Sequence, residues 1–350
     1  MRTSYTEDDV ILLLKDITGL VEPQPTEERE RLIQAGRHYC EMLPVEYVPS
    51  EAYMEAYRDA LKNYSVPTAA AVGVLADQVM RRKGSGVVLV SLARAGIPVG
   101  ILLKRYIQKK YHVCVKHYSI SIIRGRGIDK NAMKYLLRHH APETLLFVDG
   151  WIGKGAILRE LKKEIAQYKG VSSEIAVLAD PANVTDYCGT HEDILIPSSC
   201  LNCTVSGLVS RTFLRSDVIQ DGDFHGAVYY GELKDSDLSY DFIERVEREF
   251  VFENREVDGN RTDGSGMEEA IQIAKAFGVD DINFIKPGIG ETTRVLLRRV
   301  PWKVLVGEQD RDDPALAHII RLSGEKQVPV EYYPLRHYKT CGIIKKLAEL

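Results

Sequence analysis

The chain has 350 residues with 46 basic and 50 acidic side chains, which gives a formal net charge of −4 at pH 7. This length predicts two domains, and the balanced charge excludes a global attraction to nucleic acid or to an anionic membrane. The sequence shows no signal-peptide pattern and no apolar run of transmembrane length, and its six cysteines are scattered. We therefore expect a reduced, cytoplasmic protein with no membrane partner.

The first 65 residues or so are rich in helix formers and acids, and they predict a helical N-terminal cap. From Gly86 onward, short β-branched runs alternate with helix-length stretches, which is typical of an open parallel sheet. Ligands of such sheets bind beyond the carboxyl ends of the strands. The expected strands lie at 87–91, 113–121, 144–149, 174–180 and 193–197.

The segment 253–266 is polar and turn-forming, and it predicts a linker between two domains. The first domain would cover residues 1–252, including the cap. The second would be a small α/β module at 267–350 that reads helix, strand, helix, strand, helix, strand.

The segment LLFVDGWIGKGAIL at 145–158 runs from an apolar strand through a glycine-rich turn into a helix. Backbone N–H groups at such a turn approach an anion closely, and the helix N-terminus adds partial positive charge. We expect a phosphate there, with Asp149 accepting hydrogen bonds from sugar hydroxyls and Lys154 adding a mobile cation. The structural alternative is a turn that merely joins strand to helix. The predicted phosphate- and ribose-binding residues are Asp149, Gly150, Trp151, Ile152, Gly153, Lys154, Gly155, Ala156 and Ile157.

A second turn of this kind, SLARAGIPVG at 91–100, follows the expected strand at 87–91 and carries Arg94 at its apex. Two anion-suited turns at one sheet edge suit a ligand with two phosphate ends. The predicted pyrophosphate-binding residues are Ser91, Arg94, Ala95 and Gly96.

Together the two turns resemble the type I phosphoribosyltransferase family, whose pyrophosphate loop has an Arg-Gly-Gly-x-Pro-like turn and whose ribose-phosphate loop begins with two acids. The run from Arg94 to Pro98 matches the first loop, and Asp149 matches the first acid of the second. Gly150 stands where the second acid is usual. The resemblance implies phosphoribosyl transfer between phosphoribosyl pyrophosphate and a base-like acceptor, with Mg²⁺ held through the ligand rather than by the protein alone.

The same resemblance assigns roles to two further segments. SIIRGRGIDKNAM at 121–133 stands where the family has a mobile lid, so Arg124 and Arg126 would act in catalysis with Asp149. The stretch after the core strands would form the hood that recognises the base. The candidate base contacts are Ser206, Arg211, Phe224 and His225.

The phrases SISIIRGRGID, FVDGWIGKGAI, CLNCTVSGLVSRTF and DFHGAVYY resemble a narrower bacterial family named StiP, which is associated with tellurite-resistance and stress operons. That family is described as a cysteine protease. Cys200 or Cys203 with His225 would supply the thiolate and the base. The two cysteines also form a CxxC, either half of a zinc site, a redox pair, or simply two small buried residues.

The segment from 282 to 310 reads as strand, glycine-containing turn, helix and strand, and it resembles the start of the L7Ae and Pelota-like RNA-binding fold. Gly288, Glu291 and Arg294 match the family's Gly-x-x-Glu-x-x-Lys/Arg motif. The alternative is a small α/β domain used for dimerisation or for shielding the substrate. The residues expected to contact a structured RNA are Lys286, Gly288, Gly290, Glu291, Thr292, Arg294 and Arg298.

The sequence thus predicts a phosphoribosyltransferase-like open parallel α/β sheet with a helical cap, followed by a small α/β/α L7Ae/Pelota-like domain. Three functions stay open: a phosphoribosyltransferase, a cysteine protease, and a non-catalytic RNA-binding protein that senses phosphoribosyl pyrophosphate. The sequence is also compatible with a homo-oligomer.

Overall fold

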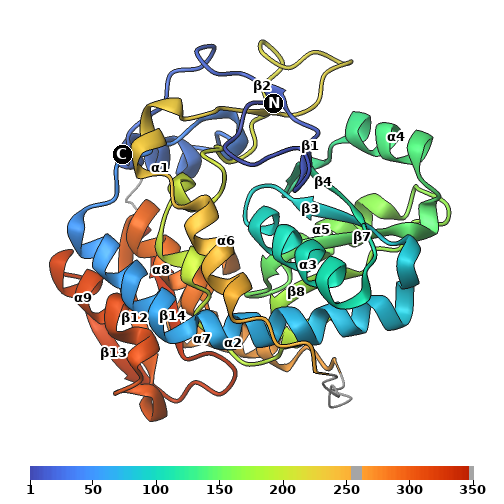
Figure 1. The fold of residues 1–350 in the computed structure, drawn as a ribbon. Coiled ribbons are helices and arrows are strands. Elements are labelled where there is room, and N and C mark those ends of the chain that lie inside the picture. Colours follow the sequence, from blue (N-terminus) through green and yellow to red (C-terminus); the bar gives the residue numbers. More distant parts are fainter. Residues whose placement is uncertain (254–261, 347–350) are drawn as a thin grey trace.

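The computed structural model describes residues 1–253 and 262–346, and it shows an α/β protein built on two sheets (Figure 1). The larger sheet has six strands, all of them parallel, in the order β1-β4-β3-β7-β8-β9. In that order the strands are Ile11–Leu12, Lys116–Ile120, Val88–Leu92, Leu145–Trp151, Ile175–Ala179 and Cys188–Thr190.

Both faces of this sheet are buried, because neighbouring residues of one strand enter different hydrophobic clusters. Leu89 of β3 packs toward α2 (Glu51–Lys83), α3 (Gly96–Tyr111) and α6 (Ser239–Arg248). Val88 and Val90 pack on the opposite side, toward α4 (Lys130–His139) and α5 (Ala156–Ile165). This burial on both faces explains the continuous apolar strands in the sequence.

The smaller sheet has the order β11-β14-β12-β13, and β14 runs antiparallel to both of its neighbours. Helix α7 covers one face, whereas α8 and α9 lie on the other. The strands are Ile285–Pro287, Thr340–Ile344, Pro301–Gly307 and Val330–Tyr333, and the helices are Ser265–Ala276, Ile289–Arg298 and Ala317–Glu325. Strand β14 was not among the elements expected from the sequence.

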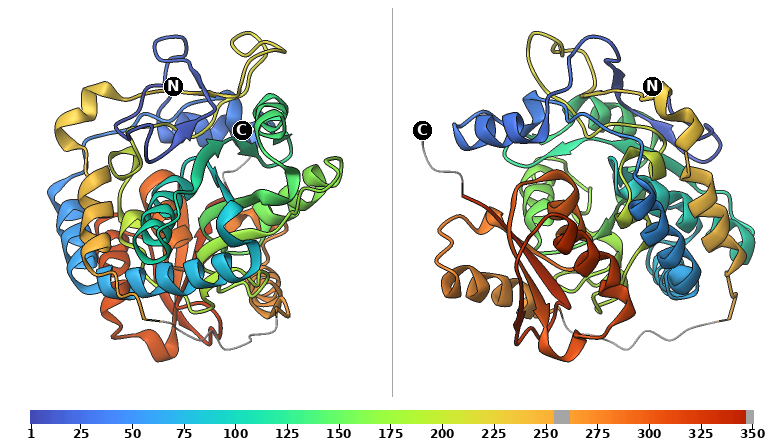
Figure 2. Two further views of the ribbon diagram at one scale, coloured as in Figure 1. Left: turned by 45° about the vertical axis from the view of Figure 1, so that its right-hand side comes forward. Right: turned by 90° about the vertical axis from the view of Figure 1, so that its left-hand side faces the viewer.

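The smaller sheet packs directly against the larger domain, as two further views show (Figure 2). One hydrophobic cluster contains Leu195 and Ile196 of the first domain together with Ile289 and Leu296 of α8. Most of the linker predicted at 253–266, namely residues 254–261, lies outside the described residues.

Four of the five strands expected from the sequence are confirmed, but the strand expected at 193–197 is wrong. The sixth strand of the sheet is β9 instead, and residues 193–196 form an irregular segment that leads into a 3₁₀ helix at Pro197–Cys200. The segment is apolar because Leu195 and Ile196 are buried in the cluster shared with α8. A short buried apolar run does not by itself distinguish a strand from such a segment.

The N-terminal cap is only partly helical. Helix α1 (Thr26–Gln34) lies in it, but β1 extends the large sheet and β2 (Lys15–Asp16) pairs with β10 (Gly226–Ala227). Helix α2 begins inside the expected cap and continues past Pro67 to cover the sheet.

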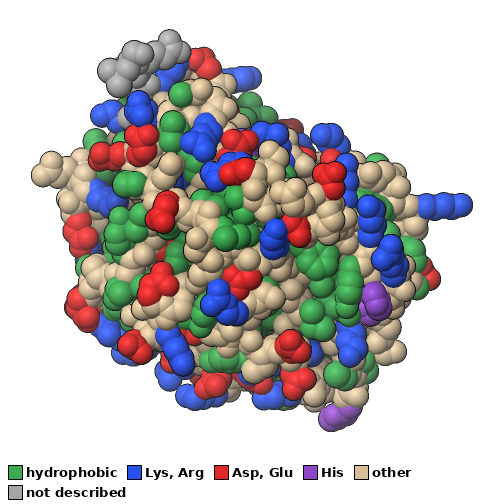
Figure 3. All heavy atoms as spheres, turned by 90° about the horizontal axis from the view of Figure 1, so that it is seen from above, with side chains coloured by type: hydrophobic (Ala, Val, Ile, Leu, Met, Phe, Trp, Pro, Cys, Tyr) green, Lys and Arg blue, Asp and Glu red, His purple; other side chains and the backbone are tan. Residues whose placement is uncertain are grey.

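Basic and acidic side chains are interspersed over the face shown in Figure 3, in keeping with the small net charge. Within the described part of the chain, none of the helices combines the length and the apolar character needed to cross a membrane.

Candidate functional site

The predicted phosphate loop connects the end of β7 to the start of α5. Gly155, which precedes the first residue of α5, has a φ of +70°, a backbone conformation that side chains with a Cβ rarely adopt. Asp149 lies on β7 near the carboxyl end of the sheet, and its carboxylate accepts a hydrogen bond from the N–H of Gly150 at 2.7 Å. The geometry therefore places a strand end, a glycine turn and a helix N-terminus together, as a phosphate site requires.

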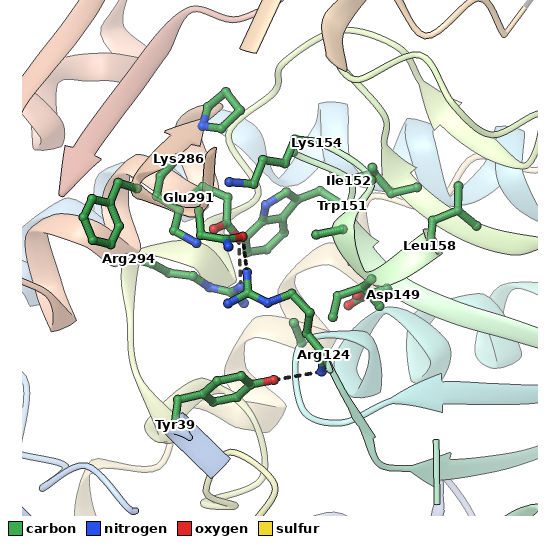
Figure 4. Close-up of a pocket in the computed structure, with 18 of the residues that line it drawn as sticks. Tyr39, Arg124, Asp149, Trp151, Ile152, Lys154, Leu158, Lys286, Glu291 and Arg294 are labelled. Carbon is green, nitrogen blue, oxygen red and sulfur yellow. Dashed lines mark hydrogen bonds and ion pairs between the residues drawn. The ribbon is translucent and has the colours of Figure 1, made fainter. Parts of the chain in front are cut away.

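A cavity of about 300 Å³ opens over this loop. Asp149 and residues 151–158 form one wall, and β11 and α8 of the C-terminal domain form the facing wall. In Figure 4 the side chain of Lys154, which belongs to the loop wall, reaches toward Lys286 and Glu291 of the facing wall, whereas Asp149 lies apart from these three. The remaining polar lining residues are Arg29, Tyr39, Arg211, Asp281, Asn283, Arg294 and Arg299.

The cavity is strongly cationic. Seven basic and three acidic side chains line it, in a protein whose overall charge is slightly negative. Partly buried walls of one sign concentrate the electric field within a cleft, so this cavity favours a ligand with several negative charges.

Burial shifts the pKa of three ionisable groups that line the cavity. It raises the pKa of Asp149 to about 6, although the N–H of Gly150 favours the charged form. It lowers the pKa of Lys154 to about 7 and that of Lys286 to about 8. These groups therefore change charge near neutral pH, as groups at ligand sites often do.

Lys154 is placed differently from the mobile cation expected from the sequence. Its side chain is buried, and its ammonium donates hydrogen bonds to the carbonyl oxygens of Ile285, at 2.6 Å, and Ile282. Both acceptors belong to the C-terminal domain. Lys154 thus fastens that domain to the loop.

The predicted pyrophosphate turn directs most of its polar side chains into protein contacts. The Arg94 guanidinium forms a buried ion pair with Glu46 at 2.8 Å and donates to the carbonyl oxygen of Val209 at 2.7 Å. Ser91 Oγ donates to the carbonyl oxygen of Gly96 at 2.9 Å. Ala95 lines the main cavity, while Arg94 borders a neighbouring one.

The predicted lid is a short hairpin of β5 (Ile122–Ile123) and β6 (Gly127–Ile128). Arg124 at its tip lines the cavity and donates to Asn283 Oδ1 of the C-terminal domain at 2.7 Å. Arg126 instead forms a half-exposed ion pair with Glu41 at 2.9 Å. The structure thus brings one of the two lid arginines to the site.

The predicted base contacts are dispersed. Arg211 lines the cavity, with its guanidinium carbon 5.1 Å from the ring centroid of Tyr39. Ser206 is buried in a small adjacent cavity beside Arg94. Phe224 packs against α4. His225 is buried, with Nδ1 2.8 Å from Ser121 Oγ, so it supports the fold near the lid.

The turn expected to contact RNA faces the first domain. Gly288, Gly290 and Thr292 are buried, whereas Lys286, Glu291 and Arg294 line the cavity. A Cβ atom on Gly290 would lie 2.4 Å from Trp151 Cε2, so this glycine allows the two domains to approach closely. The side chain of Arg298 lies outside those that the structure describes.

Arg29 and Tyr39 are among the cavity residues that were not found from the sequence. Both belong to the N-terminal cap, whose amphipathic pattern carries no signal for a ligand site. Tyr39 is held in place because its hydroxyl accepts a hydrogen bond from the N–H of Arg124 at 3.0 Å. Only the folded chain brings these residues to the sheet edge.

The cysteines proposed for a protease are not positioned with His225. Cys200 and Cys203 are both buried, and burial raises the pKa of the Cys200 thiol to about 12. A different arrangement joins Cys188, His191 and Asp180. The Cys188 sulfur lies 3.3 Å from His191 Nε2, and His191 Nδ1 lies 3.1 Å from the backbone carbonyl oxygen of Asp180 and 3.5 Å from its carboxylate. Burial also raises the pKa of the Cys188 thiol to about 12.

Among the described residues, no group of three or more His, Cys, Asp and Glu side chains is arranged to hold a metal ion.

Two solved structures with partial similarity are phosphoribosyltransferases. A hypoxanthine-guanine phosphoribosyltransferase from Bacillus anthracis str. 'Ames Ancestor' has 16% identity and a TM-score of 0.25, over 42% of this chain and 82% of that one. The hypoxanthine phosphoribosyltransferase from Trypanosoma cruzi, in complex with the product IMP, has 12% identity and a TM-score of 0.26, over 57% of this chain and 98% of that one.

Sequence comparison gives a match over nearly the whole chain. Residues 3–247 match the family described as tellurite-like stress resistance cysteine protease StiP, and residues 264–346 match the PELOTA RNA binding domain. The protein named cysteine protease StiP from Acinetobacter baylyi (strain ATCC 33305 / BD413 / ADP1) is 33% identical over 365 residues, covering 99% of this chain and 94% of that protein. The chain therefore belongs to the StiP family and carries a PELOTA domain at its C-terminal end.

Proposed function

We propose that the cavity between the two domains binds a phosphoribosyl ligand and that the protein is a phosphoribosyltransferase-type enzyme. The observation that carries this proposal is the cationic cavity itself, which opens over a glycine turn and the N-terminus of α5. A 5-phosphate would accept hydrogen bonds from the backbone N–H groups of 153–156 and would lie at the positive end of the helix dipole.

Asp149 would hold the ribose. Its carboxylate stands at the carboxyl end of β7 and lines the same cavity as the loop. In its charged form it would accept hydrogen bonds from the sugar hydroxyls and stabilise the positive charge that develops on the ring. Because its pKa lies near 6, the charged form predominates at neutral pH.

The proposed reaction is displacement at C1 of phosphoribosyl pyrophosphate. The C1–O bond to pyrophosphate breaks and pyrophosphate leaves with the bonding electrons, a nitrogen of a base-like acceptor forms the new bond to C1, and its proton passes to solvent. Magnesium prefers oxygen ligands, and the Asp149 carboxylate lines the cavity and accepts its hydrogen bond from the neighbouring backbone N–H of Gly150. Asp149 together with phosphate oxygens would hold the ion, which would neutralise the leaving group.

The test is isothermal titration of the full chain with phosphoribosyl pyrophosphate, with and without Mg²⁺. We expect saturable binding that Asp149→Asn weakens about tenfold, since hydrogen bonds to a charged group are worth about 1.5–3 kcal/mol. Asp312→Asn, at an exposed position, serves as the matched control. Absence of binding to the wild-type protein would contradict the proposal. Binding without turnover of any base would favour the non-catalytic sensor.

A second candidate is a cysteine peptidase, as the name of the Acinetobacter baylyi relative suggests. The specific observation in its favour is the chain of contacts from Cys188 through His191 to Asp180. A thiol with a raised pKa is a weak nucleophile, so this candidate requires a rearrangement that exposes and activates Cys188. Peptidase activity lost in Cys188→Ser but kept in Cys200→Ser would favour it.

A further inference from the structure

The C-terminal domain is bound to the phosphate loop itself. The Tyr338 hydroxyl donates a hydrogen bond to the carbonyl oxygen of Gly153 at 2.6 Å, and Lys154 donates to that of Ile285 at the same distance. A Cβ atom on Gly153 would lie 3.0 Å from the carbonyl oxygen of Pro287. These contacts place β11 and the start of α8 against the loop.

Three cations of the C-terminal domain line the candidate site, namely Lys286, Arg294 and Arg299. They line the cavity over the loop and also a neighbouring cavity of about 280 Å³ that reaches Arg94. Arg294 is held in place, because its guanidinium carbon lies 4.4 Å from the Trp151 ring centroid and its Nη1 lies 3.2 Å from Glu291 Oε1. The ammonium of Lys286 makes no hydrogen bond or ion pair with the residues that the structure describes.

Arg29 is a separate observation that favours an anionic ligand in this cavity. Only 3% of its surface is exposed, and its Nε atom has no hydrogen-bond partner within the described residues. Burial lowers the pKa of this guanidinium and the nearby charge of Arg299 lowers it further, whereas the carboxylates of Glu30 and Glu46 favour the charged form. Arg299 forms an ion pair with Glu30 at 2.5 Å. Arg29 lines the cavity over the loop. A buried guanidinium N–H without a hydrogen-bond partner is costly, and an anionic ligand in the cavity would supply the acceptor.

The turn expected to bind pyrophosphate does not supply the required cation, since the Arg94 side chain is already paired with Glu46. We propose that the C-terminal domain completes the ligand site, and that Lys286 and Arg294 bind the second anionic group of the ligand, its pyrophosphate. This inference rests on the proposed function, because the first anionic group is taken to be the 5-phosphate at the loop. The PELOTA domain would then act as a wall of the ligand site.

The geometry favours a small anion over an RNA stem at this surface. Gly288 and Gly290, which were expected to contact RNA, lie against Asp193 and Trp151 of the first domain, and Thr292 is buried within its own domain. A cavity of about 300 Å³ has the size of a small-molecule site. RNA binding by the same cations is therefore a competing outcome of the test.

The experiment measures binding of two fragments, ribose 5-phosphate and inorganic pyrophosphate, to the full chain by isothermal titration with Mg²⁺ present. The double variant Lys286→Gln/Arg294→Gln should weaken pyrophosphate binding at least about tenfold, because two charged hydrogen-bond donors are lost. Its affinity for ribose 5-phosphate should stay within about twofold of the wild-type value. Lys275→Gln, on the exposed side of α7, is the matched control and should change neither. Arg29→Gln, a second variant on a different element, should also weaken pyrophosphate binding.

The outcomes separate this inference from the proposed function. If the wild-type chain binds no ribose 5-phosphate, the proposed function fails first. If it binds ribose 5-phosphate but neither variant weakens pyrophosphate binding selectively, the assignment to the C-terminal domain is overturned. Loss of affinity for a short oligoribonucleotide with pyrophosphate binding unchanged would overturn it in favour of RNA. Unchanged thermal unfolding confirms that the variants are folded.

Discussion

The carboxylate of Asp193 accepts a hydrogen bond from the backbone N–H of Ile289 at 3.0 Å. Ile289 is the first residue of α8, and Asp193 also accepts from the N–H of Lys339 at 3.0 Å. A buried acid of the first domain thus caps a helix of the second. This contact fixes α8, and with it Glu291 and Arg294, over the phosphate loop.

Replacing Asp193 should loosen the two domains. In Asp193→Ala the buried N–H groups of Ile289 and Lys339 lose their acceptor, and we expect the free energy of unfolding to fall by about 2–4 kcal/mol. Denaturant unfolding followed by fluorescence measures this change. The exposed Asp312→Ala is the control and should stay within about 0.5 kcal/mol of the wild type. An equally small change in Asp193→Ala would show that the cap does not hold the domains together.

Stability should depend on pH through Lys154. Burial lowers its pKa to about 7, below the ordinary value of 10.5. Between these two values the unfolded chain binds a proton that the folded chain does not, so the free energy of unfolding rises with pH. Relative to Lys154→Met, the wild type should gain up to about 1.4 kcal/mol per pH unit between pH 7 and 9. Denaturation curves at several pH values test this, and parallel pH profiles for the two proteins would refute it.

A methyl group at position 290 should disturb the domain contact. In Gly290→Ala the new Cβ would lie 2.4 Å from the Trp151 ring, so we expect the free energy of unfolding to fall by about 1–3 kcal/mol. Gly324→Ala, in α9 and with open space around it, should be neutral or slightly stabilising. The loss should shrink when Gly290→Ala is made in a Trp151→Leu background. If the double-mutant cycle shows no such coupling, contact with Trp151 is not the reason why Gly290→Ala lowers the free energy of unfolding.

Thiol reactivity should be confined to one residue. Cys114 is exposed, whereas the other five cysteines are buried. At pH 8 we expect one thiol per chain to react rapidly with an aromatic disulfide reagent, and the rest only in denaturant. Labelling followed by peptide mass spectrometry identifies the site. Rapid labelling of Cys188 in the native protein would instead mean that the Cys188–His191–Asp180 arrangement is accessible, as a peptidase needs.

The local parts of the fold were predictable from the sequence. Strands β3, β4, β7 and β8 are apolar runs flanked by turn residues, and the loop before α5 shows its glycines in order. Such features depend on neighbours in the chain. The same reasoning failed at 193–197, where the apolar residues serve packing against α8 rather than a strand.

The parts of the site that the sequence did not predict depend on contacts between residues far apart in the chain. No local pattern announces that Glu46 pairs with Arg94, or that Lys154 donates to Ile285. Arg29 reaches the cavity from a helix whose sequence shows only an ordinary charged pattern. The sequence therefore predicted separate sites on the two domains, whereas the structure brings some residues of each, such as Asp149 and Lys286, into one cavity.

The most direct test of the central claim is a crystal structure of the full chain with phosphoribosyl pyrophosphate and Mg²⁺. We predict the 5-phosphate at the backbone of 153–156, the ribose hydroxyls at Asp149, and the pyrophosphate beside Lys286 and Arg294. A ligand bound elsewhere with this cavity empty, or a pyrophosphate group that contacts none of the C-terminal cations, would contradict the account.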